Sequence, residues 1–137
     1  MIIGVGTDIC DIRRIEQSID GHGERFLNKI FTSKEQVFCD KKPRPAMSYA
    51  KRFAAKEAVA KALSGTDTGS LSWKSVEITN DPSGRPRVLL TADAEDRAEK
   101  LCPENHKLTI SLSLSDDYPY ATAFAIAEAI PVVTQTP

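Results

Sequence analysis

The stretch AMSYAKRFAAKEAVAKAL, residues 46–63, decides how the rest of the chain is interpreted. It is rich in Ala, Lys and Glu and contains neither Gly nor Pro. Ala, Lys and Glu are among the best helix formers, whereas Gly and Pro weaken helices. Gly65 follows closely, and glycine is common just beyond a helix end. We therefore predict that Ala46–Leu63 is the strongest helix of the chain.

The residues before this helix predict one strand and three short helices. Residues 2–9 form a β-prone run interrupted by Gly4 and Gly6, and glycines inside a strand mark the close approach of another backbone or a ligand. The helices follow from apolar spacing, composition and a capping box. In order they cover residues 11–19, residues 24–30, and a segment opened by Thr32 with Glu35 three residues later.

The residues after the helix predict a second set of strands. A hairpin is indicated by alternating residues from Trp73 to Ile78, a turn at residues 80–84 and the run Val88–Leu90. An amphipathic helix over 91–101 precedes two antiparallel strands, residues 108–114 and 120–130. The predicted fold is α+β: an antiparallel sheet packed with a long helix and shorter helices. It forms one domain over residues 1–130, with a loose tail at 131–137.

Composition narrows the function classes. The 137 residues are enough for one domain with a real core, and 41% hydrophobic with 27% charged residues is an ordinary globular balance. The net charge of −1 argues against extended nucleic-acid binding but leaves a local basic patch open. No apolar run approaches the ~20 residues that span a bilayer, and the first residues do not read as a signal peptide. The three widely spaced cysteines predict free thiols in a reducing cytoplasm.

Charged residues gather on the central helix. Glu57 and Lys61 fall on one stripe, and Arg52 and Lys56 lie on a neighbouring face. One interpretation is a solvated helix with a Glu57–Lys61 pair worth only ~0.3–0.5 kcal/mol. The other is a functional site in which one acid is surrounded by bases.

Asp8 favours the functional interpretation. It is predicted to end the first strand beside two glycines, although Asp8 or Asp11 could instead cap the following helix. Carboxylates at Asp8 and Glu57 would offer hard oxygen ligands to Mg²⁺, which takes only one or two from a protein. Neighbouring lysines and arginines suit a polyphosphate. The residues alone thus predict a metal–phosphate site without naming its substrate.

Three motifs carry a resemblance to a known family. They are GVGTDI with DIRRI at residues 4–15, KRFAAKEA with KAL at residues 51–63, and Asn80-Asp81 with Gly84-Arg85-Pro86. In order and spacing they resemble the holo-acyl-carrier-protein synthases, the small bacterial type of 4′-phosphopantetheinyl transferase. The resemblance spans nearly the whole chain and implies the fold of that family.

The resemblance also implies a reaction. A serine hydroxyl of apo acyl carrier protein attacks the β-phosphate of coenzyme A, phosphopantetheine is transferred, and 3′,5′-ADP leaves, as a step of fatty acid biosynthesis. By this resemblance Asp8 and Glu57 are the Mg²⁺ ligands and act in catalysis with Lys61. The coenzyme A binding residues implied by the same motifs are Arg52, Lys56, Lys61, Gly84 and Pro86.

The same resemblance implies partners and leaves one role open. Arg14 and Arg25 are expected to dock the acidic carrier protein. A homotrimer with sites between subunits is expected, with Phe124 and Ile126 among the residues buried between chains. The general base could be a metal-bound water or an acidic group. Asp116, which stands where some relatives have histidine, could act as a polar substitute or be a turn residue.

Two other functions use the same residues. A magnesium-dependent hydrolase of nucleotide pyrophosphates would consume coenzyme A without an acceptor protein. A non-catalytic carrier-protein-binding module would tolerate loss of the charge of Glu57.

Overall fold

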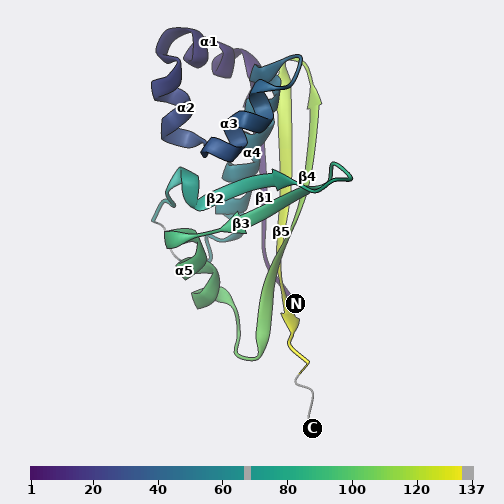
Figure 1. The fold of residues 1–137 in the computed structure, drawn as a ribbon. Helices are drawn as coiled ribbons and strands as arrows, with labels where there is room; N and C mark the ends of the chain where they lie inside the picture. Colours follow the sequence, from purple (N-terminus) through teal and green to yellow (C-terminus); the bar gives the residue numbers. More distant parts are fainter. Residues whose placement is uncertain (67–68, 134–137) are drawn as a thin grey trace.

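A computed structural model describes residues 1–66 and 69–133 (Figure 1), so the expected loose tail lies, from residue 134 on, outside the described residues. The described elements, in chain order, are β1 (Ile2–Asp11), α1 (Ile12–His22), α2 (Glu24–Ile30), α3 (Ser33–Asp40), α4 (Pro45–Ala62), the 3₁₀ turn η1 (Trp73–Ser75), β2 (Val76–Asn80), β3 (Pro86–Leu90), α5 (Ala92–Leu101), β4 (His106–Asp117) and β5 (Tyr120–Pro131). The expected α+β class is confirmed.

The strands form two antiparallel sheets. The larger has the order β1-β5-β4, and β2 pairs with β3 in a separate hairpin. Helix α4 lies along one face of the larger sheet, and the hairpin crosses in front of it (Figure 1). The core strand β5 turns alternate alanines toward α4, and all are buried: Ala121, Ala123, Ala125, Ala127 and Ala129. Small side chains on the sheet let the helix lie close to it.

Strand β1 approaches α4 even more closely. A Cβ on Gly4 would lie 1.9 Å from the carbonyl oxygen of Ala62, and one on Gly6 would lie 1.8 Å from that of Ala58. Any side chain at these positions would overlap the backbone of α4. The two glycines predicted to mark a close approach therefore mark the contact between the first strand and the central helix.

Two local predictions need correction. Asp8 lies inside β1, opposite Ala123, because the strand continues to Asp11. Asp11, whose side chain accepts a hydrogen bond from the Arg13 N–H, is therefore the helix cap. Trp73 belongs to the 3₁₀ turn rather than to the strand, which begins at Val76. The capping box at Thr32 and Glu35 is confirmed, with both reciprocal hydrogen bonds present.

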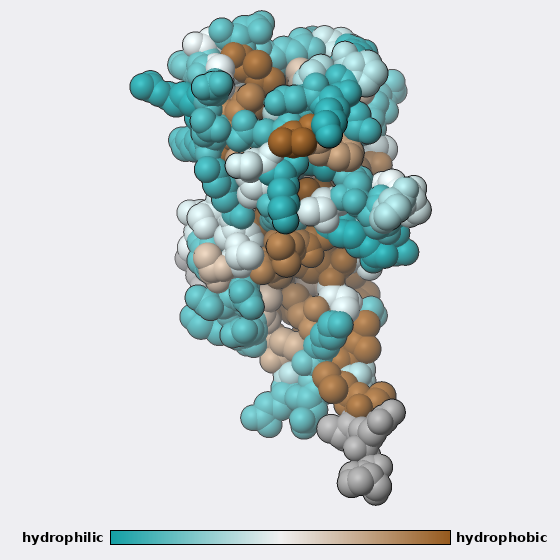
Figure 2. Space-filling view, in the orientation of Figure 1, coloured by the Kyte–Doolittle hydropathy of each residue, from teal (hydrophilic) through white to brown (hydrophobic). Residues whose placement is uncertain are grey.

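Hydrophilic residues cover most of the helical end of the molecule, and apolar surface gathers across its middle around the hairpin (Figure 2). Strands β3 and β4 carry partly exposed apolar side chains, among them Leu89, Leu108 and Ile110. A single chain therefore leaves apolar side chains of its strands partly exposed.

We predict that Gly6→Ala lowers the free energy of unfolding by about 2–3 kcal/mol or more, because β1 must move away from α4 to admit a methyl group. Urea unfolding at 25 °C measures the change. Gly21→Ala is the matched control, since a Cβ there meets nothing within 4 Å. It lies inside a helix and should be neutral or stabilise by about 0.5–1 kcal/mol. Equal stability of both variants would contradict the close contact.

Candidate active site

Asp8 and Glu57 lie on two elements that the glycine contact brings together. Lys61 of α4 donates to the carbonyl oxygen of Thr7 at 2.8 Å and to Oδ1 of Asp8 at 3.3 Å. Partial burial raises the pKa of Glu57, the charge of Asp8 raises it further, and Lys61 lowers it. These couplings place one cation and two carboxylates in a single electrostatic unit.

The donor set of this unit suits a hard divalent cation. Two carboxylates from different elements repel each other unless a positive charge lies near them, and Lys61 supplies one. No group of three or more metal-ligating His, Cys, Asp or Glu residues occurs in the part of the chain that the structure describes. Mg²⁺ needs only one or two protein carboxylates because substrate oxygens and waters complete its octahedron. Asp8 and Glu57 therefore fit Mg²⁺.

A cavity of about 720 Å³ adjoins this unit, and we call it the Trp73 pocket. Glu57 and Lys61 lie on its α4 side, and the segment from Gly69 to Trp73 forms the facing wall. Helix α5 holds that wall, because Asp93 accepts hydrogen bonds from the Ser72 N–H at 2.8 Å and the Ser72 hydroxyl at 2.6 Å. The pocket therefore has a site face on α4 and an anchored wall opposite.

A second cavity of about 670 Å³ is rich in bases, and we call it the basic pocket. Arg52 is 3% exposed, stacks over Phe38 at 4.0 Å and donates to Oδ1 of Asn80 at 2.6 Å. Among the described residues, its Nε is the buried side-chain nitrogen or oxygen left without a hydrogen-bond partner. Such an unsatisfied donor favours an anionic ligand. The other polar lining residues include Lys42, Arg44, Ser48, Lys51 and Asp81.

The structure brings the expected hairpin residues to the basic pocket only in part. Gly84 lines the pocket, with φ +90°, and its carbonyl oxygen accepts a hydrogen bond from Asn80. Pro86 begins β3 opposite Asn80 and is not among the lining residues. The two cavities share no lining residue, so one chain presents the expected site as two separate halves.

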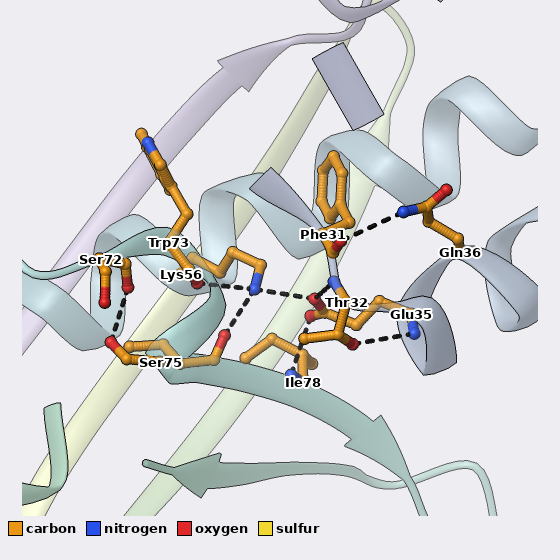
Figure 3. A network of polar contacts seen from close by, with 10 residues as sticks. Phe31, Thr32, Glu35, Gln36, Lys56, Ser72, Trp73, Ser75 and Ile78 are labelled. Carbon is orange, nitrogen blue, oxygen red and sulfur yellow. Dashed lines mark hydrogen bonds and ion pairs between the residues drawn. The ribbon is translucent and has the colours of Figure 1, made fainter. Parts of the chain in front are cut away.

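Lys56 lines the Trp73 pocket beside Glu57, but its ammonium is engaged in a buried network. It is 2% exposed and donates to the Glu35 carboxylate at 2.8 Å, to the Trp73 carbonyl at 3.0 Å and to the Val76 carbonyl at 2.6 Å (Figure 3). These three bonds use all three N–H groups of the ammonium. The ammonium of Lys56 is therefore fully engaged within the chain, although the residue borders the Trp73 pocket.

Two features of the site are not evident from the sequence. The basic pocket is lined not only by Arg52 but also by Lys42, Arg44 and Lys51. In the sequence, the only sign of this cluster is the Lys-Pro-Arg stretch at residues 42–44. Asp116, which lies inside β4 rather than in a turn, forms an ion pair at 3.0 Å with Lys51 of this pocket. Arg14 and Arg25, the expected docking bases, are exposed on α1 and α2.

Comparisons with known proteins decide the family. A family model described as the 4′-phosphopantetheinyl transferase superfamily matches residues 4–123. The chain belongs to this superfamily. A holo-[acyl-carrier-protein] synthase of Mesorhizobium japonicum is 49% identical over 132 residues, which are 96% of each protein. The resemblance seen in the motifs and the expected enzyme class are thereby confirmed.

Solved structures agree with this assignment. The holo-[acyl-carrier-protein] synthase of Neisseria meningitidis matches with a TM-score of 0.79 and 34% identity, over 93% of this chain and 99% of that one. The Helicobacter pylori enzyme, in complex with coenzyme A, matches with a TM-score of 0.74 and 29% identity, over 90% and 99% of the chains. Neither the pyrophosphate hydrolase nor the binding module is favoured by these relatives.

Among the described residues, no helix is both long and apolar enough to cross a membrane.

We predict that Asp93→Asn destabilises the protein by about 1 kcal/mol at pH 7, because it weakens the anchor of the pocket wall. The hydrogen bonds from Ser72 lower the pKa of Asp93 to about 2. Since this value lies below the ordinary ~4, ionised Asp93 stabilises the fold above pH ~4 and loses its contribution as the pH falls toward 2.

Thermal unfolding of both proteins between pH 2 and 7 measures the effect. The difference in melting temperature should shrink below pH 4 and vanish near pH 2. Asp96→Asn, on the same helix and also exposed, is the matched control, because it is Asp93 that accepts both hydrogen bonds from Ser72. A difference that persists unchanged at pH 2 would rule out the carboxylate as its source.

Proposed function

We propose that this chain transfers the 4′-phosphopantetheine arm of coenzyme A to a serine of apo acyl carrier protein, with Mg²⁺ held by Asp8 and Glu57. The observation that supports this proposal most directly is the electrostatic coupling of these two carboxylates with Lys61. It occurs in a chain whose relatives are holo-[acyl-carrier-protein] synthases. The free thiols of Cys10, Cys39 and Cys102 suit a reducing compartment, so we assign the reaction to the cytoplasm.

The residues of the unit divide the work of transfer. When bound, Mg²⁺ would neutralise charge on the pyrophosphate oxygens. Asp8 and Glu57 would hold it from two elements whose separation the glycine contact fixes. Lys61, half-exposed and anchored on the Thr7 carbonyl, can turn its ammonium from Asp8 toward a phosphate oxygen. Its positive charge would stabilise the leaving 3′,5′-ADP.

The basic pocket is proposed to bind the nucleotide end of coenzyme A. Its buried Arg52 offers an unpaired Nε, and Lys42 and Arg44 add charge at the entrance. Such a set matches a phosphate, which accepts several charge-assisted hydrogen bonds. Gly84, and Pro86 beside the pocket, would shape the wall next to the nucleotide.

A site formed between two subunits would bring the carboxylate unit of one chain next to the basic pocket of another. Coenzyme A must reach both the carboxylate unit and the basic pocket, which share no residue within one chain. The outer face of the larger sheet carries Phe124, 43% exposed, with the half-buried Ile126 and the exposed Val5. Exposed apolar faces of this kind favour self-association. We propose a homotrimer in which each site combines two neighbouring chains.

The carrier protein is proposed to dock on α1 and α2. Arg14 and Arg25 are exposed there, and an acidic carrier protein would meet positive charge. Arg13 is less available, because Asp11 holds its guanidinium in a paired contact.

We predict that Asp8→Asn and Glu57→Gln each lower the transfer rate at least ~100-fold, because each removes a ligand charge from the metal site. The assay mixes the protein with apo acyl carrier protein, coenzyme A and Mg²⁺, and weighs the carrier by mass spectrometry. EDTA should abolish the mass gain, and Asp96→Asn should leave it unchanged. Consumption of coenzyme A without a heavier carrier would indicate the hydrolase, and normal transfer by either variant would overturn the metal assignment.

We predict that two inactive variants complement each other. Glu57→Gln removes the metal half and the double variant Lys42→Ala/Arg44→Ala removes the charge of the basic half, so each alone should transfer slowly. Co-expression in equal amounts should restore about a quarter of the wild-type rate, because random trimers place two intact halves together at that frequency. Sedimentation velocity checks the trimer. No recovery in mixed trimers would mean that each site lies within one chain.

A further inference from the structure

Glu35 and Lys56 form a buried ion pair at the meeting point of four elements. They are 1% and 2% exposed, respectively, and lie on α3 and α4, with η1 and β2 directly against them (Figure 3). Charged residues are almost never buried this completely unless they are paired. Lys56 borders the Trp73 pocket, but neither member of the pair lines the basic pocket or belongs to the unit of Asp8, Glu57 and Lys61. The role of the pair therefore needs its own explanation.

Both carboxylate oxygens of Glu35 accept hydrogen bonds. Oε1 accepts from the backbone N–H of Thr32 at 2.9 Å and from Lys56 at 2.8 Å, and Oε2 accepts from the N–H of Ile78 at 2.9 Å. The same carboxylate thus caps α3, binds α4 and fixes the middle of β2. Of these contacts, the sequence predicts only the cap of α3.

Lys56 ties the other side of the junction. Its bonds to the carbonyl oxygens of Trp73 and Val76 hold η1 and the start of β2 against α4. The Trp73 ring also stacks on Phe53 of α4, with ring centroids 5.0 Å apart. Trp73 and Val76 line the wall of the Trp73 pocket that faces Glu57. Lys56 therefore sets how far this wall stands from the carboxylate unit.

The junction also reaches the basic pocket. Glu35 fixes Ile78, and two residues later in β2 Asn80 accepts the hydrogen bond of Arg52. A shift of β2 would move Asn80 relative to α4 and disturb both pockets. The ion pair therefore holds the strand that borders both cavities, through Val76 at one and Asn80 at the other.

Stability alone does not require charges here. Apolar residues of similar volume usually replace a buried ion pair with little loss, but they supply no directional bonds. The pair makes four hydrogen bonds to backbone groups of three segments. Because hydrogen bonds are directional, they fix the positions of these segments more closely than apolar contacts would. We propose that Glu35 and Lys56 are positioning residues of the transfer reaction, which place the wall of the Trp73 pocket for coenzyme A. This inference rests on the proposed function.

The test uses a neutral version of the pair. Lys56→Met with Glu35→Gln removes both charges, so that neither partner is left buried and unpaired. We expect the folded double variant to show a KM for coenzyme A raised roughly tenfold at 25 °C. Fluorescence of Trp73, the one tryptophan of the chain, should shift as the wall moves. A merely structural role would lower the folded fraction and kcat but leave KM and the emission of the folded protein unchanged.

Tyr49→Phe is the matched control. Tyr49 is buried on α4 and donates to Asp40 of α3 at 2.6 Å, so the variant removes another link between the same helices without touching either pocket. It should lower the melting temperature and leave KM and Trp73 emission unchanged.

A folded double variant with wild-type KM and emission would overturn the proposal. If the double variant does not fold, Glu35→Gln alone decides, because the amide nitrogen cannot accept a hydrogen bond. A KM raised about threefold with shifted emission supports the proposal, and wild-type values of both overturn it. Absence of transfer by the wild-type protein would overturn the proposed function instead, while Trp73 emission in the variants would still report whether the pair holds the wall.

Discussion

The closeness of β1 to α4 is the constraint on which the rest of the structure depends. Gly4 and Gly6 present no side chain to the helix, so the carbonyl groups of Ala62 and Ala58 come against the strand itself. This contact places Asp8, two residues beyond Gly6, within reach of Lys61. The unit of Asp8, Glu57 and Lys61 is thus a consequence of backbone packing. With larger side chains between strand and helix, the carboxylate of Asp8 could not come so close to α4.

Helix α4 distributes its charges in three directions from that contact. Glu57 and Lys61 face the β1 side, Arg52 reaches the hairpin at Asn80, and Lys56 points inward to Glu35. Helical periodicity permits this, since Glu57 and Lys61, four residues apart, share one face, whereas Lys56 points about 100° away from Glu57. One helix therefore supports the carboxylate unit, the basic pocket and the buried bond network that lies against the strand bordering both cavities.

Local pattern predicted most of the fold because its signals act over a few residues. The composition of residues 46–63, the capping box at Thr32 and the turn at residues 80–84 all correspond to observed features. The motifs also singled out Asp8 and Glu57, and in the structure the charge of Asp8 raises the pKa of Glu57. Lys56 could not be placed this way, since its partner Glu35 belongs to another helix and already had a capping role. Burial of a charge depends on tertiary partners, which periodicity does not contain.

The alanines of β5 limit how this protein can change during evolution. Five alternate positions of that strand face α4 and are at most 2% exposed, and several alanines of the helix are equally enclosed. Any bulkier residue there would push the helix outward and with it both edges that it supports. These positions are therefore confined to the smallest side chains, whereas the opposite face of the same strand carries residues as different as Thr122, Phe124 and Glu128. Variation among descendants should follow this alternation, with a period of two along a single strand.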